Sequence, residues 1–322
     1  MLWFKKKKGP LVGINARPRF LPESPSFAEQ FIKEARRQGR AVCHWQKQRP
    51  DLVLLIGKTR YLDLVDEYRK KGVRFVQRID GPGANPANPT VDNQNWDTYH
   101  KMDALIFQTK FCREAWESLL PMEKPAYIVF NGADEKIFSR EGKKENFGFK
   151  RLIVTAARWR KWKNLSQMIE LFRNLKRDDL GLVVAGTGAE VPRDKRILAT
   201  GKLSHQQMAR VFRAADLLLY LPWFEWCPKV VVQALVAGLP VVCSSNGGTK
   251  ELVQDCGRLV PNQRNTVKDY YSPNPVEIEQ GVKVVNDLLE NRERVRPRPD
   301  LFLSAMVEGY FQVFEKVLDK NK

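Results

Sequence analysis

The stretch Ala215–Val253, ADLLLYLPWFEWCPKVVVQALVAGLPVVCSSNGGTKELV, decides the fold of this chain. Its apolar run Leu217–Leu221 is too short for a typical helix and predicts a buried strand. After the loop 222–228, a helical pattern covers Lys229–Ala237, and a second apolar strand, Val241–Ser244, runs into a glycine-rich turn. This order predicts a βαβ unit. Its loops open at the carboxyl ends of parallel strands, where open α/β sheets bind ligands.

Outside this stretch the chain alternates strand and helix patterns, which predicts an α/β fold with doubly wound parallel sheets. Ser26 and Glu29 have the spacing of a capping box, so we expect a helix over Phe27–Gln38. The segment Asp80–Asp97 has no period and predicts a long loop. An amphipathic pattern over Leu301–Leu318 predicts a C-terminal helix. Further strands are expected at Leu11–Asn15, Ala41–Trp45, Leu52–Ile56, Phe75–Ile79, Ala104–Thr109, Ala126–Asn131, Leu152–Ala157, Leu180–Ala185, Ile197–Thr200 and Arg258–Val260. Further helices are expected at Leu62–Lys71, Arg113–Leu120, Leu165–Leu175 and Ser204–Ala214.

A domain boundary is expected near residue 135, where a turn signature at 131–134 precedes a polar stretch without an apolar period. We therefore predict an N-terminal domain over residues 1–135 and a second domain over 136–300. The amphipathic segment 301–322 is predicted to cross back to the N-terminal domain.

Composition limits the class of protein. With 43% hydrophobic and 29% charged residues, the chain is typical of a globular, soluble protein. No apolar run reaches the length of a membrane-spanning helix, and the start lacks the apolar stretch of a secretory signal. The five cysteines include no CxxC pair, which favours a reducing, cytoplasmic compartment and predicts neither a zinc site nor a disulfide scaffold.

The chain has 55 basic against 37 acidic residues, a net charge of +18. Such an excess suits a solvated basic face, an anionic membrane surface, phosphorylated small molecules or nucleic acid. Trp3 and Phe4 beside Lys5–Lys8 favour peripheral contact with an anionic membrane surface. A nucleic-acid-binding protein remains an alternative, although no zinc finger or RNA-recognition signature accompanies the charge.

The second half resembles the C-terminal domain of GT-B fold retaining glycosyltransferases of family 4, also called glycosyl transferases group 1. The resemblance rests on several motifs in order over residues 103–261. These are Ala157-Arg158 followed by Lys163-Asn164, Gly186-Thr-Gly188, Gly201-Lys-Leu203, Ala215-Asp216, Glu225-x7-Gln233 and Gly247-Gly248. It implies a GT-B architecture, with two Rossmann-like domains facing across a cleft. It also implies a metal-independent enzyme without a cofactor, which moves a sugar from a UDP- or GDP-linked donor to a carbohydrate or lipid-linked acceptor with retention.

The resemblance also implies the site residues. Arg158 and Lys163 would stabilise the leaving diphosphate, and Glu225 would contact the donor sugar. Asp80 would line the acceptor side. The remaining donor-binding residues implied are Gly186, Gly188, Lys202, Leu203, Cys227, Pro228, Lys229, Gln233, Asn246, Gly247, Gly248 and Thr249.

Two departures from the family pattern keep an alternative open. Gln233 stands where the family usually has a glutamate on the ribose hydroxyls, and the acceptor-side histidine of the N-terminal domain has no counterpart. The alternative is a nucleotide-sugar-binding protein of the same fold with impaired catalysis. His44, His100 and His205 are each expected to be surface or packed residues.

Overall fold

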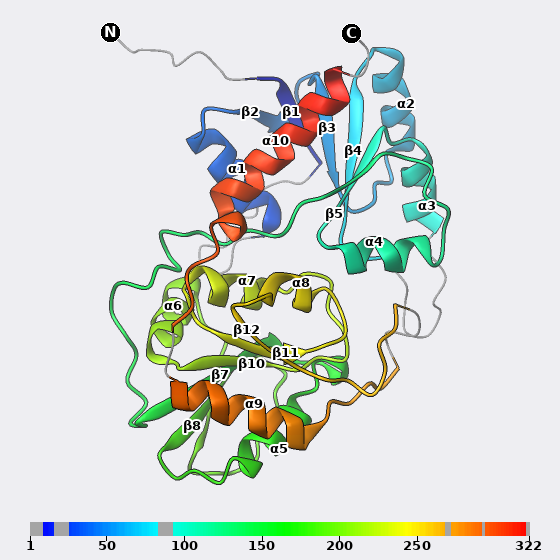
Figure 1. Cartoon of the computed structure of the whole chain (residues 1–322). Coiled ribbons are helices and arrows are strands. Elements are labelled where there is room, and N and C mark those ends of the chain that lie inside the picture. Colours follow the sequence, from blue (N-terminus) through cyan, green and yellow to red (C-terminus); the bar gives the residue numbers. More distant parts are fainter. Residues whose placement is uncertain (1–8, 16–25, 83–92, 268–271, 292–293, 320–322) are drawn as a thin grey trace, which may run out of the picture. The chain divides into compact units, whose positions relative to one another are not determined.

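A computed structural model describes residues 9–15, 26–82, 93–267, 272–291 and 294–319 (Figure 1). The chain divides into two compact units. The first unit holds residues 1–130 and 303–322, and the second holds residues 131–302. The domain boundary predicted from the sequence was residue 135. The turn belongs instead to the second unit, where the Asn131 side chain donates to the Cys227 carbonyl and Ala133 pairs with Phe302.

The described residues of the first unit form a six-stranded parallel sheet in the order β2-β1-β3-β4-β5-β6. Its strands are β1 (Leu11–Ile14), β2 (Ala41–His44), β3 (Leu52–Ile56), β4 (Arg74–Ile79), β5 (Ala104–Phe107) and β6 (Ala126–Ile128). Its helices are α1 (Phe27–Arg37), α2 (Leu62–Lys70), α3 (Asn93–His100), α4 (Lys110–Glu117) and α10 (Leu303–Asp319).

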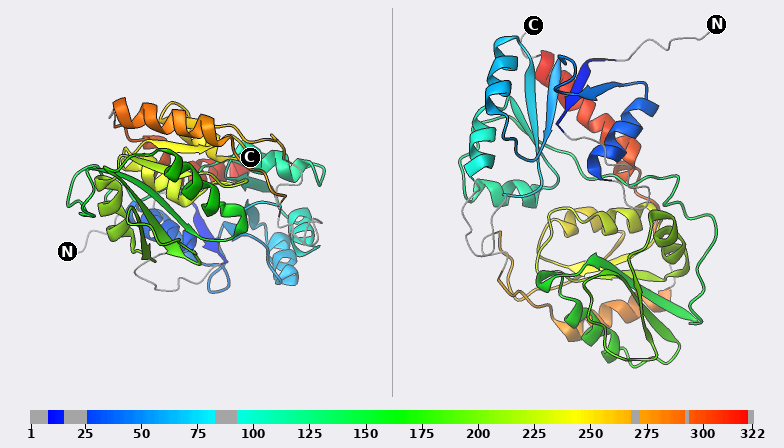
Figure 2. Two further views of the ribbon diagram at one scale, coloured as in Figure 1. Left: turned by 90° about the horizontal axis from the view of Figure 1, so that it is seen from below. Right: turned by 180° about the vertical axis from the view of Figure 1, so that it is seen from behind.

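Helices α1 and α10 pack together on one face of this sheet, while α2, α3 and α4 lie on the other (Figures 1 and 2). The predicted capping box of α1 is confirmed, because Ser26 and Glu29 bond each other's backbone amides. The apolar stripe of the C-terminal helix is buried, including Met306, Tyr310 and Phe314. This burial explains why the last helix belongs to the first unit, because its stripe completes the core over β1, β3 and β4.

The second unit has a six-stranded parallel sheet in the order β12-β11-β10-β7-β8-β9. Its strands are β7 (Arg151–Arg158), β8 (Leu180–Thr187), β9 (Ile197–Gly201), β10 (Leu217–Tyr220), β11 (Val241–Ser244) and β12 (Gly257–Val260). Its helices are α5 (Leu165–Asn174), α6 (His205–Ala214), α7 (Lys229–Val236), α8 (Thr249–Val253) and α9 (Ile278–Asn291), with 3-10 turns η1 (Lys161–Lys163) and η2 (Pro299–Leu301).

Helices α5 and α9 cover one face of the second sheet, and α6, α7 and α8 cover the other (Figures 1 and 2). Both faces are therefore buried, which explains why β7, β10 and β11 read as continuous apolar runs rather than alternating ones. The strand order turns at β7, because β8 and β9 lie on one side of it and β10 to β12 on the other.

One prediction from the sequence is wrong, and one further helix was not predicted. Helix α3 begins inside the segment 80–97 that was expected to be a loop, and its polar start gave no apolar period. No helix was expected at α9, yet Gly281, Val285 and Leu289 are buried there. A Cβ at Gly281 would lie 2.4 Å from Leu171 of α5, so glycine permits close helix packing but hides the apolar stripe in the sequence.

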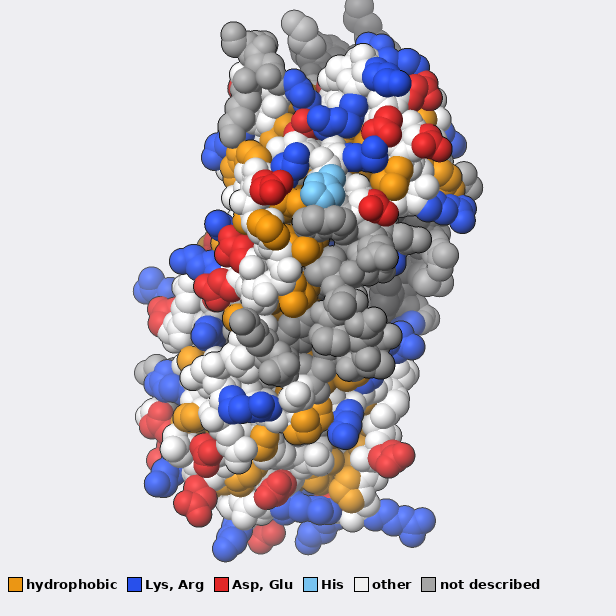
Figure 3. Space-filling view, turned by 90° about the vertical axis from the view of Figure 1, so that its right-hand side faces the viewer, with side chains coloured by type: hydrophobic (Ala, Val, Ile, Leu, Met, Phe, Trp, Pro, Cys, Tyr) orange, Lys and Arg blue, Asp and Glu red, His pale blue; other side chains and the backbone are white. Residues whose placement is uncertain are grey.

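No helix among the described residues is long and apolar enough to cross a membrane. On the face shown in Figure 3, Lys and Arg side chains are dispersed among acidic ones. The segment Trp3–Lys8, on which the membrane-surface prediction rests, lies outside the described residues.

Candidate active site

Most of the predicted site residues lie at or just beyond the carboxyl ends of the strands of the second sheet. Arg158 ends β7, Gly186 lies near the end of β8, and Lys202 follows β9. Glu225 lies in the loop after β10, and Gly247 lies in the turn after β11. Because β7 and β10 flank the point where the strand order reverses, their loops open where doubly wound sheets bind ligands.

Lys163 and Glu225 meet at this reversal point. The Lys163 ammonium donates a hydrogen bond to Glu225 Oε1, and only 18% of the lysine side chain and 12% of the glutamate side chain are exposed. Tyr220, the last residue of β10, joins the pair. Its hydroxyl lies 3.2 Å from Lys163 Nζ and 3.1 Å from Glu225 Oε1. The three groups form a compact polar cluster at the carboxyl edge of the second sheet.

Two further hydrogen bonds hold the loops that carry this cluster. The Trp223 amide donates to the Trp162 carbonyl at 2.9 Å. The Asn164 side chain, which is buried, donates to the Leu221 carbonyl at 3.0 Å. Asn164 also has a positive φ of 58°, which directs the chain from η1 into α5. The loop after β7 is therefore attached to the loop after β10 on both sides of Lys163.

The electrostatics of Lys163 follow from its burial. Burial, together with the nearby Arg160 guanidinium, lowers the pKa of Lys163 to about 8. The Glu225 carboxylate opposes this effect, because an adjacent negative charge stabilises the ammonium. Lys163 is thus a cation at neutral pH that a small rise in pH neutralises. Arg158, by contrast, is exposed and has no ion-pair partner in the described part of the chain.

The turn after β11 is built around the backbone of Glu225. The Gly248 amide donates to the Glu225 carbonyl at 2.7 Å. Gly247 has a φ of 104°, and a Cβ there would lie 2.8 Å from the Glu225 nitrogen, so only glycine fits. The Asn246 amide donates to Asn262 Oδ1, and the Asn246 side chain donates to the Trp223 carbonyl.

Thr249, which follows Gly248 in this turn, has a side chain with unsatisfied hydrogen-bonding capacity. Its side-chain oxygen is buried and has no hydrogen-bond partner among the described residues. Of the four residues of this turn that are predicted to bind the donor, Asn246 and Gly248 have backbone amides that are already engaged within the protein, whereas Thr249 has an unsatisfied hydroxyl.

The turn after β8 packs against the end of β7. A Cβ at Gly186 would lie 1.8 Å from the Ala157 carbonyl oxygen, and one at Gly188 would lie 3.0 Å from the Trp159 carbonyl oxygen. The Trp159 indole donates to the Ala185 carbonyl at 2.9 Å. Both glycines therefore have a packing role that accounts for them without a ligand, and they bring the backbone of the turn close to Arg158.

Gln233 lies on α7 opposite the start of α6. Its Nε2 lies 3.4 Å from Nε2 of His205. Burial is the main cause that lowers the pKa of His205, with Lys229 adding to the effect and Asp134 opposing it. The imidazole is therefore neutral at pH 7, and its ring packs against Phe138 at 5.5 Å between centroids. His205 is a packed residue as expected, but it touches a predicted donor residue, which the sequence alone did not indicate.

The other predicted donor residues differ in exposure. Cys227 is buried, and its sulfur accepts a hydrogen bond from the Asn131 amide at 3.4 Å, which fits a packed residue rather than a nucleophile. Pro228 is buried and precedes α7, while Lys229 is exposed at the first turn of that helix. Lys202 is exposed and Leu203 is half-buried in the loop after β9.

Asp80 follows β4 in the first unit. Its side chain is 58% exposed and accepts hydrogen bonds from Arg78, which is buried, and from Gln108. The Arg78 guanidinium also lies 4.1 Å from the centroid of the Phe27 ring. The carboxylate is therefore fixed at the carboxyl end of the first sheet.

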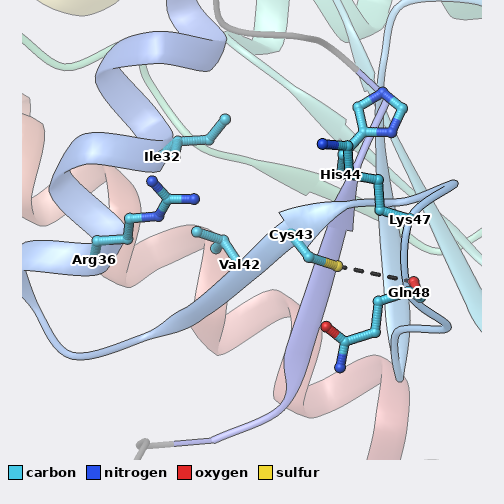
Figure 4. A pocket seen from close by; sticks show the side chains of 7 residues that line it. All are labelled: Ile32, Arg36, Val42, Cys43, His44, Lys47 and Gln48. Carbon is cyan, nitrogen blue, oxygen red and sulfur yellow. Dashed lines mark hydrogen bonds between the residues drawn. The ribbon is translucent and has the colours of Figure 1, made fainter.

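A pocket of about 410 Å³ lies elsewhere in the first unit, between α1 and the edge strand β2 (Figure 4). Its lining includes Arg36, His44 and Lys47, and Cys43 points toward Gln48 with its sulfur 3.9 Å from the Gln48 carbonyl oxygen. None of the residues predicted for the active site lines it. Within the described ranges, no group of three or more His, Cys, Asp or Glu side chains could hold a metal ion.

Comparison with known proteins adds a family to this geometry. The sequence model described as "Glycosyl transferases group 1" matches residues 135–296, which is half of the chain. A GDP-mannose-dependent alpha-mannosyltransferase of Mycolicibacterium smegmatis is 30% identical over 84 residues, covering 25% of this chain and 22% of that protein. An N-acetyl-alpha-D-glucosaminyl L-malate synthase of Bacillus anthracis is 23% identical over 262 residues, covering 75% of this chain and 66% of that protein. The chain thus spans less than two thirds of the length of either relative.

The fold is shared more widely than the sequence. Anabaena Alr3699/HepE, in a crystal structure with UDP-glucose, aligns with a TM-score of 0.62 at 12% identity, over 97% of this chain and 99% of that one. The lipopolysaccharide outer core galactosyltransferase WaaB aligns with a TM-score of 0.57 at 14% identity, over 92% and 80% of the two chains. The prediction of an α/β, GT-B class fold is confirmed.

Proposed function

Because the chain belongs to the group 1 glycosyl transferases, we propose that it transfers a glycosyl unit from a nucleoside-diphosphate sugar to an acceptor hydroxyl. The observation that carries this proposal is the partly buried cluster of Lys163, Glu225 and Tyr220 at the reversal point of the second sheet. A cation and a carboxylate in one water-poor spot suit a substrate with both a diphosphate and sugar hydroxyls.

In this proposal the cations act on the leaving group. As the bond from the anomeric carbon to the diphosphate oxygen breaks, negative charge grows on the diphosphate. Lys163 and Arg158 stabilise that charge, which removes the need for a metal ion. The Thr249 hydroxyl and the backbone of the turn at Gly247 supply further donors. Glu225 accepts hydrogen bonds from the donor sugar.

The proposed stereochemistry is retention. The acceptor oxygen forms its bond to the anomeric carbon on the side that the diphosphate leaves, and its proton passes to a diphosphate oxygen. No strong general base is needed for this step. Asp80, fixed by Arg78 and Gln108, would bind an acceptor hydroxyl.

The nucleoside would lie toward α6 and α7. Gln233 would accept a hydrogen bond from a ribose hydroxyl, and the backbone of Lys202 and Leu203 would contact the base. The relatives suggest where a donor screen should begin, since one is named for GDP-mannose and one structure holds UDP-glucose. Carbohydrates, lipid-linked sugars and small anions such as L-malate are the acceptors to test, because a basic chain suits an anionic acceptor.

The experiment that tests the proposal combines binding with turnover. UDP-, GDP- and ADP-sugars are screened by thermal shift, and those that stabilise the protein are assayed for transfer and for hydrolysis, with and without a metal chelator. Anomeric configuration of the product is read by NMR. We expect one nucleotide class to bind and transfer with retention in the presence of chelator. Binding without transfer to any acceptor would favour the catalytically impaired alternative, and inversion would contradict the proposed geometry.

The transfer rate should depend on pH through Lys163. Because the pKa of Lys163 in the empty protein is lowered to about 8, its ammonium loses the proton as pH rises through that value. The ratio kcat/KM, which reports ionisations of the free enzyme, should therefore fall about tenfold per pH unit above it. The charged groups that face this ammonium are Glu225 and Arg160. Rates are measured between pH 6 and pH 10, values that span the transition.

The matched variant for this pH profile is Lys163→Arg. A guanidinium stays protonated throughout that range, so the variant should lose the decline near pH 8 even if its maximal rate is lower. A decline that persists unchanged in Lys163→Arg would assign the ionisation to another group.

Gln233→Glu should tighten binding of the nucleoside diphosphate. A hydrogen bond to a charged acceptor is stronger by about 1 kcal/mol, which corresponds to roughly a fivefold lower Kd. The new carboxylate would lie beside His205 and should raise the pKa of that imidazole. Calorimetry with UDP and GDP measures the gain, and Gln206→Glu, at an exposed position on α6, is the control. An equal gain for 2′,3′-dideoxy nucleotides would show that Gln233 does not contact the ribose.

A further inference from the structure

Tyr220 is a buried polar residue that the proposed mechanism does not yet use. Its side chain is 1% exposed, and the three residues before it in β10 are leucines. Tyr220 pairs with Cys243 of β11 through the backbone, so its ring is fixed in the centre of the second sheet. Its hydroxyl nevertheless reaches both charged members of the cluster.

The direction of these two hydrogen bonds follows from chemistry. A lysine ammonium has only donors and an ionised carboxylate has only acceptors, whereas a phenol has one donor and can also accept. The Tyr220 hydroxyl must therefore accept from Lys163 and donate to Glu225. Burial raises the pKa of Tyr220 above that of a free phenol, so the hydroxyl keeps its proton at neutral pH. The Tyr220 hydroxyl thus bridges Lys163 and Glu225, and it remains a donor to Glu225 whether or not Lys163 is protonated.

We propose that Tyr220 is a positioning residue that holds the Glu225 carboxylate in place when the donor diphosphate draws Lys163 away. This inference rests on the proposed function. In the empty site Glu225 has two partners, and binding of a diphosphate removes one of them. The bond from Tyr220 remains and fixes the carboxylate oxygen at one point. Tyr220 thereby sets how strictly Glu225 recognises the hydroxyls of the donor sugar.

Phenylalanine provides a minimal variant, because Tyr220→Phe removes the hydroxyl and keeps the ring that fills the sheet. The control is Tyr99→Phe in the first unit, where a buried tyrosine hydroxyl donates to the Pro121 carbonyl at 3.1 Å. The Tyr99 hydroxyl also accepts a hydrogen bond from the Glu123 amide at 2.9 Å, so each variant loses a hydroxyl that both donates and accepts, and a general loss of stability should appear in both. Only Tyr220→Phe should change the behaviour of Lys163 and Glu225.

The first measurement needs the protein alone. Trace acetylation with acetic anhydride at a series of pH values, read by mass spectrometry, gives the pH at which Lys163 becomes reactive, with the exposed Lys161 as internal reference. Loss of an acceptor for the ammonium should lower the midpoint of Lys163 by about one pH unit in Tyr220→Phe. If the midpoint of Lys163 were the same in Tyr220→Phe as in the parent, the hydrogen bond from Lys163 to Tyr220 would be contradicted. This result does not depend on whether the protein transfers sugar.

The second measurement uses the donor that the screen identifies and its monodeoxy analogues. The ratio of kcat/KM for the donor to kcat/KM for each analogue does not depend on the fraction of active enzyme. For the hydroxyl that Glu225 contacts, this ratio should fall about tenfold in Tyr220→Phe and stay unchanged in Tyr99→Phe. A lowered Lys163 midpoint with an unchanged ratio would overturn the positioning role. Absence of transfer by the parent protein would refute the proposed function. The acetylation measurement would then still test whether Tyr220 bridges Lys163 and Glu225.

Discussion

Replacing Lys163 with alanine should lower kcat for glycosyl transfer by about 10²- to 10³-fold, the usual effect of removing one preorganised donor to a developing negative charge. Two hydrogen bonds between the loops after β7 and β10 hold the backbone on both sides of Lys163, so its ammonium already lies at the reversal point where we propose that the diphosphate binds. Arg158 remains in the variant, and its exposed guanidinium keeps part of the binding energy. The loss should therefore fall more on kcat than on KM.

The same substitution should change the empty protein. Without Lys163, the Glu225 carboxylate keeps only Tyr220 as a partner within the cluster and is only 12% exposed, so the free energy of unfolding should decrease by about 1–3 kcal/mol. The variant Lys163→Ala/Glu225→Ala removes both charges and should recover part of this stability. Stability is measured by urea unfolding with tryptophan fluorescence.

Lys161→Ala is the matched control, because it removes an exposed lysine from the same 3-10 turn. It should keep kcat within about twofold and leave stability within about 0.5 kcal/mol of the parent. Equal losses of activity in Lys161→Ala and Lys163→Ala would show that the general basic charge of the turn matters, and that the pair with Glu225 does not.

Much of the fold was predictable because its signals are local. Ser26 and Glu29 have the spacing of a capping box, and the runs in β3 and β11 match their predicted bounds. The helices α3 and α9 were missed for opposite reasons. The first is polar at its start, and the second buries a glycine where an apolar residue would have marked the stripe. Tertiary packing supplies what these two sequences lack.

The candidate site shows the same limit. The family resemblance implied that Lys163 and Glu225 belong to one donor site, but not that they pair in the empty protein. Tyr220 was not predicted as a site residue, because it ends an apolar strand and an aromatic residue at such a position is typical of the core. A hydroxyl at the last position of such a strand, just before a polar loop, was the available signal. The bridge that it forms depends on side-chain distances that no sequence pattern encodes.

Gly186→Ala should cause a large loss of stability in the second unit. The position pairs with Ala157 between β8 and β7, and the new Cβ would lie 1.8 Å from the Ala157 carbonyl oxygen. This atom belongs to a central strand and has no flexible side chain to yield, and φ at Gly186 is 111°. We expect the free energy of unfolding to fall by about 3 kcal/mol or more. Because the clash lies beside Arg158, nucleotide binding should weaken as well.

Gly201→Ala is the control that separates the effect of a steric clash on stability from the effect of the backbone conformation. Gly201 also ends a strand of the second sheet with a positive φ, 68°, but a Cβ there would meet nothing within 4 Å. The control should therefore lose only the conformational penalty of about 1 kcal/mol. Urea unfolding of both variants, followed by tryptophan fluorescence, measures the difference. If the two variants were equally stable, β7 and β8 could separate at little cost, and the turn after β8 would not hold Arg158 in place.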